Sequence, residues 1–295
     1  MHSHKDRPWE QAFEDMVYWE WEGLPSESGI SSAVGFIERA LQMPQGAKVL
    51  DLGCGLGYHA IELARRGYEV TALEWSQPFL EAATRRAAEA GVNVRFVRGD
   101  MTCMTFESEF DAAILWDNTF AIFPHEENVA TLDGIRRALR SGGLALIDTQ
   151  NYTSLPEELK QGWGFAGDDP NLLFLTQGTK NVLQARFGFD VIGINLATGK
   201  RPTMPFSWRL YLLPELERLV ADAGLTLLAV YGHDPKVVDW KAWTRGEPYP
   251  YALEGFTERA AKRILLCQVP ASSPSGPPAD REMRGESQHE TEASQ

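Results

Sequence analysis

The stretch Val49-Leu50-Asp51-Leu52-Gly53-Cys54-Gly55-Leu56-Gly57-Tyr58-His59 decides the fold, because in it an apolar run ends in an acid and three alternating glycines. Val49, Leu50 and Leu52 predict a buried parallel strand. The glycines allow a tight turn at the carboxyl end of that strand, where a Cβ would keep a ligand away from the backbone. Ligands of open α/β sheets bind at this edge, so the stretch predicts an adenosine-type cofactor lying across Gly53 to Gly57.

The spacing of the glycines separates two kinds of cofactor. A dinucleotide fingerprint has the form G-x-G-x-x-G, whereas this loop is G-x-G-x-G and carries Tyr58 where the third dinucleotide glycine would stand. Asp51 precedes the loop, and its charge would repel a pyrophosphate but attract an amine. S-adenosylmethionine carries an ammonium and a sulfonium and has no phosphate, so it suits this pattern. The alternative is a glycine-rich turn that binds no ligand.

Two later acids stand at or just after the ends of predicted strands. Glu74 ends the strand that begins at Tyr68, at about the spacing at which an acid binds both hydroxyls of an adenosine ribose. The alternative role for Glu74 is that of a helix-capping or surface acid. Asp100 follows the predicted strand Val94 to Val97, where its carboxylate would accept a hydrogen bond from the adenine amino group. Met101 beside it would lie against the adenine ring.

The composition is that of an ordinary globular chain of 295 residues, with 43% hydrophobic and 23% charged residues. The formal net charge of −13 disfavours nucleic acid as a partner, since such a surface repels phosphate backbones. No apolar run is long enough for a membrane span, and the amino terminus lacks the apolar core of a signal peptide. The three cysteines are scattered without metal-ligand spacing, so we expect no metal site and a cytoplasmic location.

Strands and helices alternate at short intervals through residues 47–149, which predicts a doubly wound sheet with right-handed crossovers. From residue 151 the pattern changes to strands without long helices between them, so we expect an inserted antiparallel sheet over the cofactor site. These strands are predicted at Asn171–Leu175, Lys180–Phe189, Val191–Leu196 and Pro205–Leu213. The predicted parts of the chain are a helical amino-terminal cap (1–44), the cofactor-binding core (45–150), the inserted β cap for the substrate (151–212), the carboxyl-terminal part of the core (213–270) and a disordered tail (271–295).

In this order the motifs resemble those of the class I S-adenosylmethionine-dependent methyltransferases. The matching segments are Val49–Ala64, Val70–Ser76, Gly99–Met101 and Leu139–Gly143. The resemblance implies a seven-stranded Rossmann-like sheet whose last strand is antiparallel and inserted beside its predecessor. The inserted strands and the aromatic amino-terminal segment are similar to the small-molecule branch, which includes glycine-type and natural-product amine N-methyltransferases. One departure, Asp117-Asn118-Thr119-Phe120 in place of an Asp/Asn-Pro-Pro-aromatic motif, disfavours nucleic-acid and protein-amide substrates.

The resemblance also implies roles for particular residues. The glycines would bring backbone close to the methionine part of the cofactor, Asp51 would act near its amine, Glu74 would hold the ribose, and an Asp–Met pair would hold the adenine. The full set of expected cofactor contacts is Asp51, Gly53, Gly55, Gly57, Glu74, Trp75, Asp100, Met101, Leu115 and Trp116, although the family commonly carries a smaller residue than Trp75.

The acceptor must be aligned behind the sulfonium methyl, and an amine acceptor must be neutral when it attacks. The candidate catalytic residues are Tyr18, His125 and His233, with Asp117 as a further possible base. We expect transfer to a small molecule, with an amine nitrogen ahead of oxygen or carbon. The alternatives are a non-catalytic S-adenosylmethionine-binding protein and a nicotinamide oxidoreductase, which Tyr58 in the glycine pattern disfavours.

Overall fold

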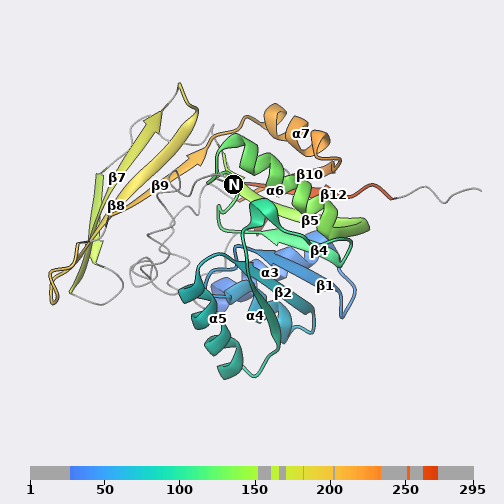
Figure 1. Ribbon diagram of the computed structural model, residues 1–295, viewed down its shortest axis with the longest axis horizontal. Coiled ribbons are helices and arrows are strands. Elements are labelled where there is room, and N and C mark those ends of the chain that lie inside the picture. Colours follow the sequence, from blue (N-terminus) through green and yellow to red (C-terminus); the bar gives the residue numbers. More distant parts are fainter. Residues whose placement is uncertain are drawn as a thin grey trace, which may run out of the picture.

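The computed structural model describes residues 27–151, 161–165, 171–181, 183–201, 203–233, 251–252 and 262–271. Within these ranges the chain forms a large mixed sheet with helices on both faces and a separate four-stranded antiparallel sheet, which projects from one side of it (Figure 1). Tyr18 and the aromatic segment around it lie outside the described residues, as does most of the predicted tail.

The large sheet has the strand order β11-β10-β12-β5-β4-β1-β2-β3. Its strands are β1 (Lys48–Leu52), β2 (Glu69–Glu74), β3 (Val94–Arg98), β4 (Phe110–Leu115), β5 (Leu139–Gln150), β10 (Thr226–His233), β11 (Tyr251–Ala252) and β12 (Lys262–Gln268). Five neighbouring strands are parallel, in the order β5-β4-β1-β2-β3. β12 lies between β5 and β10 and is antiparallel to both. The predicted doubly wound sheet with an antiparallel last strand is therefore confirmed, and the two-residue β11 is an addition at its edge.

Helices cover the two faces separately. On one face α3 (Glu27–Leu41) and α4 (Tyr58–Arg65) pack apolar residues such as Phe36 and Leu63 against the strands, and α5 (Gln77–Glu89) contacts β3. On the other face lie the 3-10 turn η2 (Met101–Cys103), α6 (His125–Ala138) and α7 (Leu213–Asp222). The apolar run of β4 is buried between these layers, as a central parallel strand should be.

β5 begins before the apolar run Leu144–Ile147. The extended chain begins at Leu139, which pairs with Phe110, and the register then shifts before Leu144 pairs with Ala112. Gly142, between these paired residues, forms a backbone hydrogen bond with the segment after β12: its N–H donates to the Val269 carbonyl at 3.0 Å. Gly142 takes a φ of 80°, which only glycine adopts at low cost, so the bulge falls at this residue.

The small sheet consists of β6 (Gln161–Phe165), β7 (Leu172–Asn181), β8 (Arg186–Asn195) and β9 (Thr203–Arg209), all antiparallel as predicted. The predicted break near Asp190 is wrong, because that residue pairs with Gln177 inside a continuous strand. The turn lies earlier, where the Asn181 side chain accepts a hydrogen bond from the Gln184 N–H at 3.0 Å. We call β6–β9 the cap sheet; the predicted domain boundaries stay predictions.

No helix in the described part of the chain is long and apolar enough to span a membrane.

Candidate active site

The glycine loop turns sharply at the carboxyl end of β1. Gly53, Gly55 and Gly57 take φ angles of 67°, 52° and 79°, in the left-handed region that favours glycine. The N–H groups of Gly53 and Cys54 both donate to the Leu73 carbonyl of β2, at 2.8 and 3.1 Å. Gly57 is the residue before α4, so the loop leads directly from the strand into the helix, as the sequence predicts.

The three glycines differ in the space around them. A Cβ on Gly53 would lie 2.7 Å from Thr119 Cγ2, and one on Gly57 would lie 3.0 Å from Ala83 Cβ, so both positions are closed by protein packing. A Cβ on Gly55 would meet no heavy atom of the described residues within 4 Å. Gly55 is therefore the position at which the loop leaves room for a ligand against its backbone.

Asp51 lies beneath this loop with only 3% of its surface exposed. Its carboxyl accepts a hydrogen bond from the Ala60 backbone, while its oxygen Oδ2 is buried and has no hydrogen-bond partner among the residues that the structure describes. Burial, together with the negative charge of Glu74 and then that of Asp117, raises the pKa of Asp51 to about 7. A buried carboxyl in this state is stabilised by a ligand that brings a positive charge.

Glu74, at the end of β2, is held at both oxygens by backbone N–H groups. Its Oε2 accepts from Gly55 and its Oε1 from Ser76, each at 2.9 Å. The carboxylate therefore spans from its own strand to the glycine loop, as the predicted ribose-binding acid should. Trp75 follows it, partly buried, and its carbonyl accepts from the Arg98 guanidinium at 3.3 Å.

Asp100 and Met101 follow β3 and reach the same edge of the sheet. Asp100 caps η2, because its Oδ1 accepts from both the N–H and the hydroxyl of Thr102 at 2.8 Å. Met101 is buried, and its Cε would lie 3.0 Å from a Cβ on Gly53. The structure thus brings the Asp–Met pair against the glycine loop, although the two segments are far apart in sequence.

Leu115 and Trp116 mark the carboxyl end of β4 but point to opposite faces. Leu115 is buried in the cluster with α6, and Trp116 is buried on the α3 side. The Trp116 indole lies with its centroid 6.0 Å from that of Phe36 and 6.2 Å from that of His59. Both side chains therefore serve as core packing in this structure, and their predicted contacts with the cofactor stay predictions.

The loop that follows β4, residues 116–123, is strained. Asp117, Asn118 and Ala121 have φ angles of 59°, 58° and 71°, which non-glycine residues rarely adopt. Each such residue costs on the order of 1–3 kcal/mol and persists only where the surroundings impose it. We call this segment the β4 loop; the sequence carried no glycine or proline signal for its conformation.

The cap sheet imposes that conformation. Trp208 Nε1 of β9 donates to the Asn118 carbonyl at 2.7 Å, and the Arg209 N–H donates to the Ala121 carbonyl at 2.7 Å. Arg186 of β8 donates through its guanidinium to the carbonyl of the next loop residue at 3.1 Å. The cap sheet is therefore attached to the edge of the large sheet that carries Asp51 and Glu74.

Two of the three candidate catalytic residues fall outside the described side chains. Tyr18 lies wholly outside the described residues. His233 is the last residue of β10, and only its backbone is described. His125 is exposed at the start of α6, and its Nδ1 lies 3.2 Å from Tyr211 Oη. That buried phenol oxygen also accepts from Asn128 Nδ2 at 3.1 Å, so Tyr211 contacts two side chains of α6. Burial raises the pKa of Tyr211, and a catalytic role for His125 stays a prediction.

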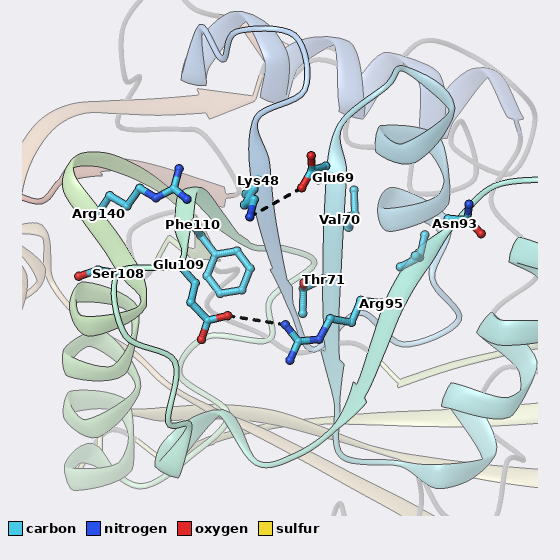
Figure 2. Close-up of a pocket in the computed structure, with 11 residues that line it drawn as sticks. Lys48, Glu69, Val70, Thr71, Asn93, Arg95, Ser108, Glu109, Phe110 and Arg140 are labelled. Carbon is cyan, nitrogen blue, oxygen red and sulfur yellow. Dashed lines mark ion pairs between the residues drawn. The ribbon is translucent and has the colours of Figure 1, made fainter.

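A surface hollow of about 680 Å³ opens at the opposite edge of the large sheet. It is lined by residues at the amino ends of β1–β4, and Figure 2 shows two ion pairs there, Lys48 with Glu69 at 3.9 Å and Arg95 with Glu109 at 3.6 Å. These four charged side chains are largely exposed. The hollow is a solvated feature away from the glycine loop, so it is not the cofactor site.

Comparison with known proteins agrees with this geometry. Residues 49–143 match the family model described as a methyltransferase domain. The cypemycin N-terminal methyltransferase of a Streptomyces species is 31% identical over 233 residues, which is 76% of this chain and 83% of that protein. The chain belongs to the class I S-adenosylmethionine-dependent methyltransferases. The match covers more of the chain than the predicted core alone.

Other relatives of this methyltransferase are more distant. The glycine/sarcosine N-methyltransferase of Aphanothece halophytica is 28% identical over 50% of this chain and 59% of its own length. Among solved structures, the CcbJ methyltransferase of Streptomyces caelestis has a TM-score of 0.67 at 20% identity, over 88% of this chain and 96% of that one. The S-adenosylmethionine-bound amino pentose methyltransferase CalS10 has a TM-score of 0.59 at 17% identity, over 91% and 99%. These two structures share the fold.

The residues at the edge suit the cofactor of this methyltransferase, S-adenosylmethionine. The buried, unpartnered Oδ2 of Asp51 is placed for a cationic group, and the space at Gly55 accommodates a ligand against the loop backbone. Glu74 stands at the strand end predicted for the ribose-binding acid, where the N–H groups of Gly55 and Ser76 hold its two oxygens.

Proposed function

We propose that this methyltransferase transfers a methyl group to an amine nitrogen of a small-molecule acceptor. The observation that carries the proposal is the concentration of carboxylates at one edge of the sheet. Asp51, Glu74 and Asp117 lie close enough for the two outer charges to raise the pKa of the first. Asp148, at the carboxyl end of β5, accepts from the Asn118 N–H at 3.3 Å. Such an edge attracts cationic ligands and disfavours anionic ones.

The acids would divide into two groups by position. We expect Asp51 and Glu74, beneath and beside the glycine loop, to hold the cofactor. Asp117, in the β4 loop, would then draw in the ammonium form of the acceptor. When bound, S-adenosylmethionine supplies a methyl group made electrophilic by the positive charge on sulfur. The chain must align the neutral amine behind that methyl and take its proton beforehand, for which Tyr18, His125 and His233 are the candidate bases.

The named relatives support nitrogen as the acceptor atom. The cypemycin and glycine/sarcosine enzymes are N-methyltransferases by name, as is the sugar N-methyltransferase KedS8 among the structures. An oxygen acceptor is the second candidate, because a ubiquinone biosynthesis O-methyltransferase of Methylocella silvestris is 28% identical over 67% of this chain. The two candidates differ in the atom that receives the methyl group, which can be measured directly.

The test is methyl transfer from S-adenosylmethionine carrying a 13C-labelled methyl group. The purified protein is screened against matched pairs of small amines and alcohols, and the products are examined by NMR. We expect release of S-adenosylhomocysteine with amines and a product signal in the N-methyl region. A product signal only in the O-methyl region would overturn the nitrogen assignment.

Glu74→Gln is expected to weaken S-adenosylhomocysteine binding about tenfold, because a charged acceptor for the ribose hydroxyls is replaced by a neutral amide. Calorimetry measures the affinity. Glu69→Gln is the matched control, since Glu69 lies at the other end of β2 with 68% of its side chain exposed. Equal affinities for the two variants would contradict the ribose role.

A further inference from the structure

Asn118, in the β4 loop, carries a side-chain oxygen that accepts no hydrogen bond from the described residues. Both of its backbone polar groups form hydrogen bonds: the N–H donates to Asp148 Oδ2 at 3.3 Å, and the carbonyl accepts from Trp208 Nε1 at 2.7 Å. Its side-chain oxygen Oδ1 is buried and has no hydrogen-bond partner in the described part of the chain. Buried polar atoms are nearly always paired, so an oxygen left in this state within a site calls for a donor from outside the protein.

The position of Asn118 places that oxygen at the reacting end of the site. β4 pairs with β1, with Leu115 opposite Leu52, so the β4 loop and the glycine loop leave the sheet side by side. The contact is direct, since Thr119 Cγ2 would lie 2.7 Å from a Cβ on Gly53. Asn118 therefore stands beside the loop that the cofactor's methionine part is expected to follow.

We propose that Asn118 positions the acceptor amine, with its Oδ1 accepting a hydrogen bond from an N–H of the acceptor. This inference rests on the proposed function, because an amide oxygen recognises a nucleophile that carries hydrogen on nitrogen. One amine hydrogen bound in this way fixes where the nitrogen lone pair points, which an in-line attack requires. Trp208 is a positioning residue in the same arrangement, since its indole holds the carbonyl of the strained Asn118.

A purely structural role for Asn118 is the competing explanation. Asparagine tolerates the left-handed region better than most residues, so the φ of 58° alone would favour it. Asn118→Gly separates the two roles, because glycine keeps the left-handed backbone and removes the amide. Ala121→Gly is the matched control, since Ala121 has a φ of 71° in the same loop and carries no polar group.

The probe is sinefungin, in which a carbon bearing an amine replaces the methylated sulfur of S-adenosylmethionine. Its amine occupies the place of the transferred methyl group, so it tests the neighbouring acceptor position without a known acceptor. S-adenosylhomocysteine has nothing at that place and reports the rest of the site. Calorimetry gives both dissociation constants for the wild type and each variant.

We expect Asn118→Gly to weaken sinefungin about tenfold while S-adenosylhomocysteine changes less than about twofold. Trp208→Phe, which removes the indole N–H and keeps an aromatic ring, should show the same selective loss at about threefold. Ala121→Gly should change neither ligand. Equal effects of Asn118→Gly on the two ligands, or no effect on either, would overturn the positioning role. The acceptor atom is decided separately by the labelled product, so a failure of the proposed function is distinguishable.

Discussion

Asp51→Asn is expected to weaken S-adenosylhomocysteine binding about a hundredfold. The substitution keeps an oxygen for the Ala60 backbone and removes the charge that a cationic ligand would meet in a buried site. Removing one partner of a buried charge pair costs about 2–5 kcal/mol, because the other charge is left uncompensated. Calorimetry at pH 8 measures the loss, and an affinity within threefold of wild type would contradict the assigned role.

The same variant is expected to stabilise the ligand-free protein. The folded pKa of Asp51, about 7, is raised from an ordinary value of 3.8, so the unfolded chain ionises first as pH increases. Stability is therefore lost between about pH 4 and pH 7, and the full penalty of about 4 kcal/mol applies above pH 7. Urea unfolding should show Asp51→Asn more stable than wild type at pH 8, by a margin that shrinks towards pH 4. A margin independent of pH would contradict the proposed state of the carboxyl.

Gly55→Ala is expected to weaken cofactor binding by at least about tenfold, since its new Cβ would occupy the space left for the ligand. The left-handed backbone adds about 1–2 kcal/mol of strain, which lowers stability as well. Gly91→Ala is the matched control, because Gly91 also has a positive φ, 67°, and open space around it, but lies beyond α5 away from the loop.

We expect the two glycine variants to lose similar free energies of unfolding and to differ only in S-adenosylhomocysteine affinity. Urea unfolding and calorimetry on the same preparations give both quantities. If Gly55→Ala binds the ligand as Gly91→Ala does, the space beside Gly55 is not the cofactor site.

The parts of the site that depend on local sequence were predictable. The strand, the glycine turn and Asp51 are contiguous, and glycine spacing constrains the backbone directly. Glu74 was predictable from the alternation of strand and helix, because each parallel strand ends at the same edge. The prediction did not contain the bonds of Glu74 to Gly55 and Ser76, since these depend on how the two loops lie relative to each other.

The parts that depend on distant contacts were not predictable. The β4 loop adopts its strained form because Trp208, 90 residues further along the chain, binds the Asn118 carbonyl. Asp117 and Asn118 are residue types that tolerate the left-handed region, but Ala121 is not, and its φ of 71° has no signal in the loop itself. In the same way, the place of Trp116 at a strand end was predictable, whereas the orientation of its side chain depends on packing against Phe36. His125 was a candidate catalytic residue from the sequence, without any indication that it contacts Tyr211.

The most direct test of this account is a crystal structure with S-adenosylhomocysteine bound. We predict that the amino acid part of the ligand lies along the glycine loop beside Gly55, with its ammonium at Asp51 Oδ2. The Glu74 carboxylate should accept hydrogen bonds from the ribose hydroxyls. A ligand bound elsewhere, or bound with its ribose out of hydrogen-bond reach of Glu74, would contradict the account.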